Sequence, residues 1–256
     1  TTFDIHPVTF LHNSFSPLTQ FLEQSSYDKY FILVDENTLQ HCLPKLIANV
    51  EELSQAEVLE IESGEQNKSL EIAVQLWLSL AELGASRKSL FINLGGGVIS
   101  DLGGFVASTF KRCMDFIHIP TSLLGQVDAA IGGKTGIDFG GLKNQIGLFS
   151  MPEEVFIAEE FLDTLSERHL QNGFAEMLKH GLIADKNYWK QLSEIDDINA
   201  ENVTPFIQRS VEIKMNIVEA DFKESGLRKA LNFGHTIGHS LESYSLEDLH
   251  ELRLRL

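Results

Sequence analysis

Short apolar segments and helical periods alternate along the first part of the chain. Five segments rich in isoleucine, valine and phenylalanine have the length and composition of buried strands. They cover residues 30–34, 57–61, 89–94, 115–119 and 155–158. Residues 69–83 and 98–110 carry apolar positions at helical spacing. Parallel strands need crossovers long enough to hold a helix, so the alternation predicts a mostly parallel sheet covered by helices, an architecture typical of nucleotide-binding domains.

The pattern changes near residue 161, where the strand signals stop. Residues 167–184, 202–221 and 227–243 have the spacing of amphipathic helices. We therefore predict an α/β nucleotide-binding domain with a mostly parallel sheet over residues 1–159. An all-helical domain is expected over residues 160–256.

Composition narrows the range of partners. The 256 residues carry 20 lysines and arginines against 37 aspartates and glutamates, a formal charge of −17. Such a charge argues against binding to nucleic acid or an anionic membrane, and an anionic substrate needs a local cluster of cations. No basic leader and no apolar run of about 18 residues is found, so we expect a cytoplasmic protein. Cys42 and Cys113 lack the spacing of a disulfide framework or a thiolate zinc site.

A glycine-rich turn follows the third predicted strand. Residues 95–101 are Gly-Gly-Gly-Val-Ile-Ser-Asp, and the next helix continues with Gly103 and Gly104. Glycines let the backbone approach a ligand, and a helix N-terminus offers free amides to a pyrophosphate. Ser100 stands where the dinucleotide fingerprint has its third glycine, so the turn alone is equally consistent with a tight strand-to-helix connection.

Three polar segments of the first domain have candidate roles in binding. Asp35, followed by Asn37, can accept hydrogen bonds from a ribose or cap the next helix. Residues 63–69 either offer a lysine to a phosphate or form a solvated loop that ends in a serine cap. In residues 120–147, many glycines beside Lys134 and Lys143 indicate a loop shaped around an anion.

The helical region holds the candidates for metal and proton-transfer chemistry. Glu176 and Lys179 are three residues apart and share a helix face, as a surface ion pair also would. His235 and His239 lie one helical turn apart, which with a carboxylate from another helix favours a metal or proton-transfer site. Several cations supply the local positive field that a phosphorylated substrate requires. They are Arg112, Lys134, Lys143, Lys179, Lys214 and Arg228.

Six segments resemble the sugar-phosphate cyclase family, and within it the 3-dehydroquinate synthases, over nearly all of residues 30–250. They are SGEQNKS at 63–69, GGGVISDLGGF at 95–105, PTSLLGQVDAAIGGKTGID at 120–138, GLKNQIG at 141–147, NGFAEMLKHG at 172–181 and LNFGHTIGH at 231–239. Each is long enough to be specific. The resemblance implies an NAD-binding α/β domain joined to a helical metal-binding domain, with the active site in the cleft between them.

The resemblance also implies roles for individual positions. NAD would contact Asp35, Asn37, Glu65, Lys68, Gly96, Gly97, Asp101, Thr121, Ser122, Lys134 and Lys143. The substrate-binding and catalytic positions would be Arg112, Asp128, Lys134, Asn144, Lys179, Lys214, Arg228, Asn232 and His239. A divalent metal, zinc or in its place cobalt, would be held by Glu176, His235 and His250.

By resemblance, the chain is expected to convert 3-deoxy-D-arabino-heptulosonate 7-phosphate into 3-dehydroquinate and phosphate, a lyase step of the shikimate route to aromatic amino acids. NAD would act as a catalytic hydride carrier, and the family implies a homodimer. The alternatives are a cyclase that makes another cyclitol, a metal-dependent polyol dehydrogenase and a non-catalytic NAD-binding module. The family continues past its third metal ligand as His-Gly-Glu, whereas residues 250–256 are His-Glu-Leu-Arg-Leu-Arg-Leu, so we expect the helical domain to be incomplete at this end.

Overall fold

A six-stranded parallel sheet lies at the centre of the computed structural model, which describes residues 8–12 and 14–234. The strand order is β1-β8-β5-β4-β2-β3. The strands are β1 (Val8–Phe10), β2 (Tyr30–Asp35), β3 (Glu57–Ile61), β4 (Leu90–Gly95), β5 (Asp115–Pro120) and β8 (Glu154–Ile157). The five predicted strands are confirmed. The sequence pattern missed β1, which has only three residues and pairs with β8 at the edge of the sheet.

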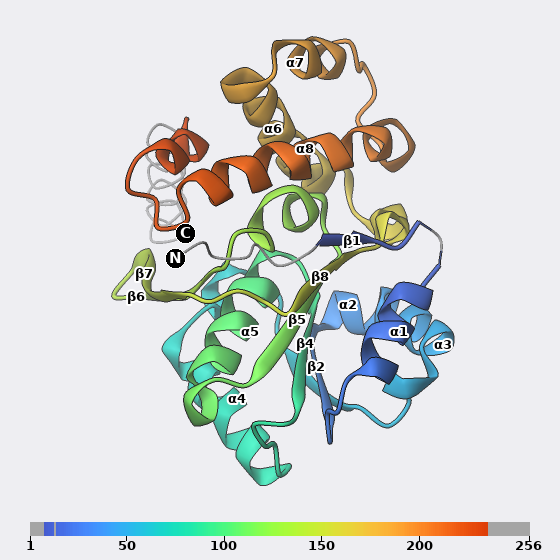
Figure 1. Cartoon of the computed structure of the whole chain (residues 1–256), viewed down its shortest axis with the longest axis vertical. Coiled ribbons are helices and arrows are strands. Elements are labelled where there is room, and N and C mark those ends of the chain that lie inside the picture. The colour runs from blue at the N-terminus through green and yellow to red at the C-terminus, as the bar shows by residue number, and fades with distance from the viewer. Residues whose placement is uncertain (1–7, 13, 235–256) are drawn as a thin grey trace, which may run out of the picture.

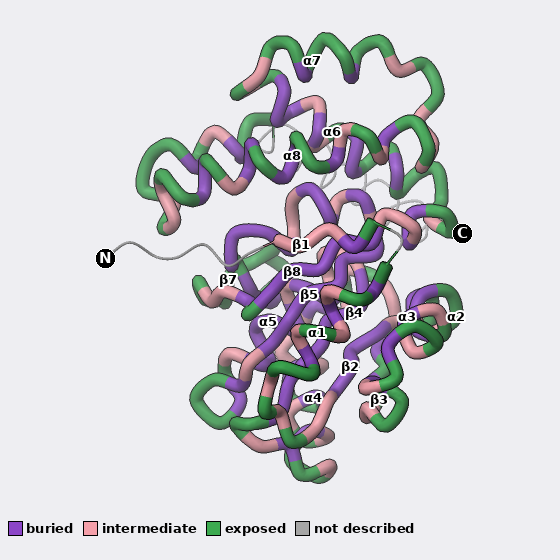
Figure 2. Tube along the Cα trace, turned by 45° about the vertical axis from the view of Figure 1, so that its right-hand side comes forward, coloured by how far each residue is buried: buried purple, intermediate pink, exposed green. Residues whose placement is uncertain are grey.

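Helices cover both faces of this sheet (Figure 1). On one side lie α1 (Ser16–Gln24), α2 (Glu36–His41) and α3 (Leu43–Asn49), and on the other lie α4 (Leu70–Glu82) and α5 (Gly97–Thr109). Successive side chains of a strand point to opposite faces, so Ile32 and Val34 of β2 enter the first core, whereas Phe31 and Leu33 enter the second. Burial on both faces explains why this strand is a continuous apolar run. Figure 2 shows the buried chain concentrated in the central strands.

The second part of the chain packs three helices beyond the carboxyl ends of the strands (Figure 1). They are α6 (Glu167–Ala184), α7 (Lys186–Ser193) and α8 (Ala200–Ala220). Their apolar faces form a third core with β8 and with η4 (Gly125–Ala129), a short π-helix. Of the predicted helix at 227–243, the described part is a 3-10 turn, η6 (Leu227–Asn232). None of the described helices is long and apolar enough to span a membrane.

Residues 134–149 form a hairpin, so the expectation of a loop throughout 120–147 is wrong for this part. Strands β6 (Lys134–Phe139) and β7 (Leu142–Phe149) pair antiparallel, with Ile137 opposite Ile146. The turn between them is Gly140-Gly141, whose φ values of 61° and 77° suit a tight hairpin connection. Short 3-10 turns complete the fold: η1 (Glu51–Leu53), η2 (Glu65–Asn67), η3 (Phe110–Arg112) and η5 (Glu159–Thr164).

Candidate active site

A cavity of about 770 Å³, the nucleotide cavity, opens at the carboxyl ends of β2, β4 and β5. This is the edge at which parallel α/β sheets bind ligands. Nine of the eleven positions predicted to contact NAD line it. They are Asp35, Asn37, Glu65, Lys68, Gly96, Gly97, Asp101, Thr121 and Ser122. The far wall comes from the start of α6, with Ser166, His169 and Asn172, which the sequence analysis did not single out.

The glycine turn after β4 lies in close contact with the segment that follows β5. A Cβ atom on Gly96 would lie 3.1 Å from Oγ of Ser122, and one on Gly97 would lie 3.2 Å from Cβ of Ala129. The turn leads into α5, whose N-terminus receives no hydrogen bond from a capping side chain. Its first amides are therefore available to an anion in the cavity.

For Asp35 and the segment 63–69, the sequence left open a choice between ligand binding and a structural role, and the structure shows features of both. Asp35 lines the cavity and also caps α2, because its Oδ1 accepts a hydrogen bond from the Thr38 amide over 2.8 Å. Ser69 caps α4, as expected if the segment ends in a serine cap. Lys68 is only 3% exposed, whereas the other residues of the segment are partly or fully exposed. Its ammonium lies 2.9 Å from Glu65 and 3.3 Å from Asp101.

A second cavity of about 650 Å³, the cationic cavity, adjoins the first and shares Asp101 and Ala129 with it. Six positions predicted to contact the substrate line it. They are Asp128, Lys134, Asn144, Lys214, Arg228 and Asn232. Burial raises the pKa of Asp101 to about 6, against the opposing charge of Lys68. The Asp101 carboxyl, which lines both cavities, therefore changes its charge near neutral pH.

Buried charges define the floor of the cationic cavity. Lys214 on α8 donates to Oδ1 of Asp128 on η4 over 2.5 Å. Burial alone would raise the pKa of Asp128, but the charges of Lys214 and Lys179 lower it below its ordinary range, so this carboxylate stays ionised. Arg228 is 1% exposed, and its guanidinium donates to the carbonyls of Phe222 and Gly132 over 2.7 and 2.9 Å. Among the described residues, no carboxylate forms an ion pair with this arginine within 4.0 Å.

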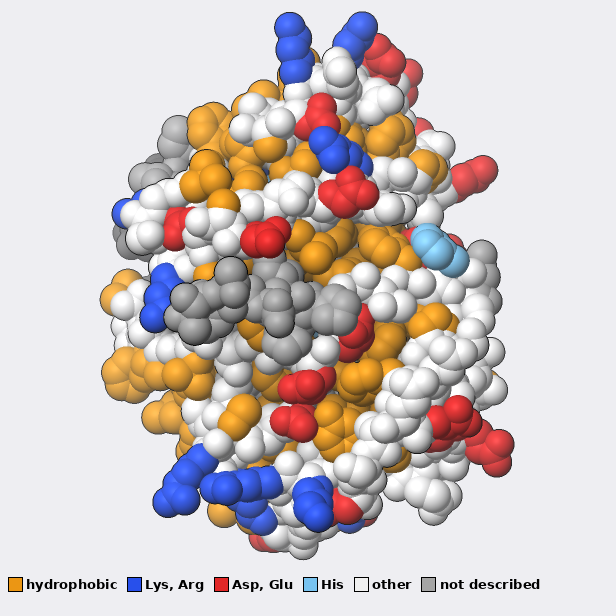
Figure 3. Space-filling view, in the orientation of Figure 1, with side chains coloured by type: hydrophobic (Ala, Val, Ile, Leu, Met, Phe, Trp, Pro, Cys, Tyr) orange, Lys and Arg blue, Asp and Glu red, His pale blue; other side chains and the backbone are white. Residues whose placement is uncertain are grey.

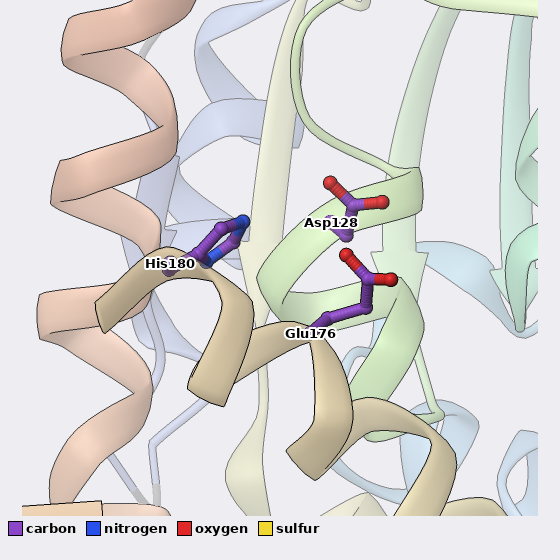
Figure 4. Close-up of side chains that lie close together, drawn as sticks. All are labelled: Asp128, Glu176 and His180. Atoms are coloured by element: carbon purple, nitrogen blue, oxygen red, sulfur yellow. The ribbon is translucent and has the colours of Figure 1, made fainter. Parts of the chain in front are cut away.

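The described residues bring together three possible metal ligands: Asp128, Glu176 and His180, whose ligand atoms lie within 4.8 Å of one another. Figure 4 shows the three side chains around the space between α6 and η4. His180 is fully buried, and its Nδ1 lies 2.7 Å from Oγ of Ser210. In the part of the chain described, Nε2 has no hydrogen-bond partner. Burial lowers the pKa of His180 to about 4, so the imidazole is neutral, the form that binds a metal.

This donor set fits a divalent metal such as zinc or cobalt, which accept imidazole nitrogen and carboxylate oxygen. Glu176 also pairs with Lys179, which is 8% exposed, so the alternative of a surface ion pair is wrong. The sequence analysis missed His180, although its i, i+4 spacing from Glu176 was a usable signal. Three predicted site residues, His235, His239 and His250, lie outside the described residues.

Three predicted positions are not placed as expected. Arg112 lies at the amino ends of the strands, in a surface hollow with Arg87, Lys88 and Lys111. Figure 3 shows lysine and arginine side chains gathered at that lower end of the molecule. Lys143 is exposed on β7 and lines neither cavity, and Lys134 lines the cationic cavity only. Contacts of Arg112 with the substrate, and of Lys134 and Lys143 with NAD, stay predictions.

The sequence analysis also missed Glu224 of the cationic cavity. Its carboxylate accepts hydrogen bonds from Lys134 over 2.6 Å and from Asn232 over 2.8 Å. One glutamate among 37 acidic residues gives no signal in the sequence. Its position depends on a contact between residues 90 positions apart.

Known proteins match the chain over most of its length. Residues 58–172 match the family model described as 3-dehydroquinate synthase N-terminal, and residues 173–250 match the 3-dehydroquinate synthase C-terminal model. The 3-dehydroquinate synthase of Parabacteroides distasonis is 50% identical over 232 residues, which cover 90% of this chain and 65% of that protein. The chain thus spans slightly less than two thirds of that relative's length.

Two solved structures share the fold. 2-Deoxy-scyllo-inosose synthase, complexed with carbaglucose-6-phosphate, NAD+ and Co2+, aligns with a TM-score of 0.82 at 22% identity, covering 93% of this chain and 68% of that one. ValA, the 2-epi-5-epi-valiolone synthase of Streptomyces hygroscopicus, with NAD+ and Zn2+ bound, aligns with a TM-score of 0.74 at 26% identity. This second alignment covers 90% of the present chain and 66% of ValA.

Proposed function

The chain belongs to the 3-dehydroquinate synthase family, and on that premise we propose that it converts 3-deoxy-D-arabino-heptulosonate 7-phosphate into 3-dehydroquinate and phosphate. The observation that carries the proposal is the junction of the nucleotide cavity and the cationic cavity at Asp101 and Ala129. A cyclase that uses NAD catalytically must hold cofactor and phosphorylated substrate in contact, since hydride passes between them in both directions. Two adjoining cavities, one of them rich in cations, meet this requirement.

In this proposal the nucleotide cavity binds NAD. The free amides at the start of α5 suit the pyrophosphate, and Asp35 at the end of β2 suits the ribose hydroxyls. When bound, NAD supplies a hydride acceptor and donor. The ValA structure, a relative of the same fold, contains NAD+ and Zn2+, which supports the assignment of both groups.

The metal would be held around Glu176, with Asp128 and His180 within reach and His235 and His250 as the ligands that the family implies. A bound zinc or cobalt ion supplies a Lewis acid beside the substrate hydroxyls. Asp128, kept ionised by Lys214, is suited to accept hydrogen bonds from those hydroxyls. Burial of Lys179 beside Glu176 places a further cation at the site.

The phosphate and carboxylate of the substrate would bind at Lys134, Arg228 and Asn232 in the cationic cavity. These groups bring positive charge and hydrogen-bond donors to one wall of a protein that is strongly acidic overall. We also propose a homodimer in the cytoplasm, which family membership supports. The small anionic substrate is the partner that the cavity favours, rather than nucleic acid or a membrane.

The test is to supply the purified protein with zinc or cobalt, NAD and the heptulosonate phosphate, and to follow inorganic phosphate and NADH together. Because a cyclase returns the hydride within each turnover, phosphate should be released while absorbance from NADH stays near baseline. NADH that grows in step with substrate loss would identify a dehydrogenase instead. Glycerol as the only substrate should give no signal, and a failure to release phosphate would exclude the activity.

A further inference from the structure

His180 has a ring nitrogen, Nε2, that is buried and has no hydrogen-bond partner among the described residues. The whole side chain is 0% exposed, so water does not solvate this atom. Leaving a buried polar atom without a partner costs free energy. Figure 4 shows the ring beside the carboxylates of Asp128 and Glu176. A ligand bound at this place would supply the partner that Nε2 lacks.

A series of hydrogen bonds fixes which nitrogen of this ring carries the proton. The hydroxyl of Tyr188 donates to the carbonyl of Phe206 over 2.9 Å, which uses its only hydrogen. The same hydroxyl also bonds to the side chain of Ser210, so Ser210 is the donor of that bond. Nδ1 of His180 lies 2.7 Å from the Ser210 oxygen, whose only hydrogen is then already used. Nδ1 therefore carries the N–H and donates to Ser210.

This arrangement makes Nε2 of His180 an acceptor. A neutral imidazole has a single N–H, and here it lies on Nδ1, so Nε2 presents a lone pair. Histidines that bind metals in proteins almost always donate their other ring N–H to an oxygen, which fixes both the tautomer and the orientation of the ring. The bond from Nδ1 to Ser210 has this form.

The groups around Nε2 suit a divalent metal. The ligand atoms of Asp128, Glu176 and His180 lie within 4.8 Å of one another, and the ligands of one zinc ion are about 3–4 Å apart, so small side-chain rotations suffice. The ammonium groups nearby already contact carboxylates, Lys214 that of Asp128 and Lys179 that of Glu176. Both ammonium groups oppose the binding of a cation, and a further ligand offsets part of that repulsion.

We propose that Nε2 of His180 is a metal ligand in addition to those that the family implies, and that Ser210 and Tyr188 are positioning residues that keep it an acceptor. The proposal rests on the function proposed above only in taking zinc or cobalt as the ion. Tyr188 lies on α7 and Ser210 on α8, and neither is a member of the ligand cluster. Removal of either hydroxyl should nevertheless weaken metal binding, because the ring would lose its fixed tautomer.

The test measures the binding of cobalt(II) alone, by titration and by visible absorption, which responds to the ligands and geometry of the ion. His180→Asn keeps a side-chain amide near the position of Nδ1 and removes Nε2. We expect its dissociation constant for cobalt to rise about tenfold or more, with a changed absorption spectrum. Ser210→Ala should raise the constant about tenfold. Tyr188→Phe should change it in the same direction.

Two exposed positions provide matched controls. His12→Gln removes a surface imidazole that lies 3.3 Å from Glu159. Ser193→Ala removes an exposed hydroxyl on α7 that donates to the Trp189 carbonyl over 2.8 Å. Both variants should bind cobalt within about twofold of the natural protein, with the same spectrum.

An unchanged dissociation constant and an unchanged spectrum in a folded His180→Asn protein would overturn the proposal and leave the proposed function intact. Thermal unfolding without metal establishes that each variant is folded. If His180→Asn does not fold, Ser210→Ala decides, and natural affinity with a natural spectrum in that variant would also overturn the proposal. Phosphate release from the heptulosonate phosphate is measured separately. Its absence in a natural protein that binds cobalt would count against the proposed function alone.

Discussion

Lys68 donates a hydrogen bond from Nζ to Oδ1 of Asn144 over 2.8 Å, which joins the segment between β3 and α4 to the hairpin β6–β7. The same ammonium lies 2.9 Å from Glu65 and 3.3 Å from Asp101. One buried cation therefore connects residues of the nucleotide cavity with a residue of the cationic cavity. A change at Lys68 should affect both.

We expect Lys68→Met to lower the free energy of unfolding by about 3 kcal/mol, because it leaves the partly buried carboxylate of Asp101 without the buried cation that neutralises it. It should also weaken NAD binding. Urea denaturation measures the first effect, and a fluorescence titration with NAD measures the second. Lys190→Met, at an exposed position on α7, is the control and should change stability by less than about 0.5 kcal/mol. Equal, small losses in the two variants would contradict the central role of Lys68.

Metal binding is expected to depend on Glu176, the residue shared by the family's ligand set and by the cluster with Asp128 and His180. Glu176→Gln replaces a charged ligand by a neutral amide and should lower bound zinc per chain by about tenfold or more. Elemental analysis after dialysis against a fixed zinc concentration gives the stoichiometry. The neighbouring surface variant Glu167→Gln, on the first turn of α6, should retain the metal. Full zinc content in Glu176→Gln would exclude this site.

Stability should decrease with rising pH because of Glu154. Burial raises the pKa of this carboxyl from 4.5 to about 7, against a hydrogen bond from Thr9 at 2.8 Å. An acid with a raised folded-state pKa contributes stability that is present below pH 4.5 and lost as the pH rises to 7, at about 1.4 kcal/mol per pKa unit. Glu154→Gln should therefore be more stable than the natural protein at pH 8, by about 2–3 kcal/mol, and nearly equal at pH 5. Melting curves at pH 5 and pH 8 measure the difference in stability between the two proteins. Glu51→Gln, at an exposed position, is the control. The same difference between the natural protein and Glu154→Gln at both pH values would contradict the prediction.

Gly103→Ala should destabilise the protein even though alanine favours helix. A Cβ atom at Gly103 would lie 1.8 Å from Oδ1 of Asn93, a buried residue held by His118 at 3.2 Å. Overpacking costs about 1–3 kcal/mol, which exceeds the gain of about 1 kcal/mol in helix propensity. Ser108→Ala on the same helix is the control. A rise in melting temperature for Gly103→Ala would show that the strand and helix can separate at little cost.

The sequence predicted the elements whose apolar pattern is set by burial on two faces. Strands β2 and β4 were recognisable because nearly every position is buried. The hairpin was not, since glycines at 136, 140, 141 and 147 interrupt its strands and lie beside lysines. The division into domains at residues 159 and 160 stays a prediction.

Site residues were predictable where they cluster in one segment. Gly96, Gly97 and Asp101 follow one strand, and topology alone brings them to the cavity. Arg112 shows the limit of reasoning from charge, because a count of cations does not tell which end of a strand each one occupies. Glu224 owes its position to packing between distant segments, which the sequence pattern does not contain. His180 could have been found from its spacing of four residues from Glu176 on α6.

The pairing of β1 with β8 also sets an order of events during synthesis. Thr9 and Glu154 bond across this pair, although they are 145 residues apart in the sequence. At the rate at which a ribosome extends a chain, β1 emerges on the order of ten seconds before its partner exists. Because its neighbour in the sheet is β8, β1 cannot pair there until β8 has been synthesised. An early segment of the polypeptide therefore reaches its native place late.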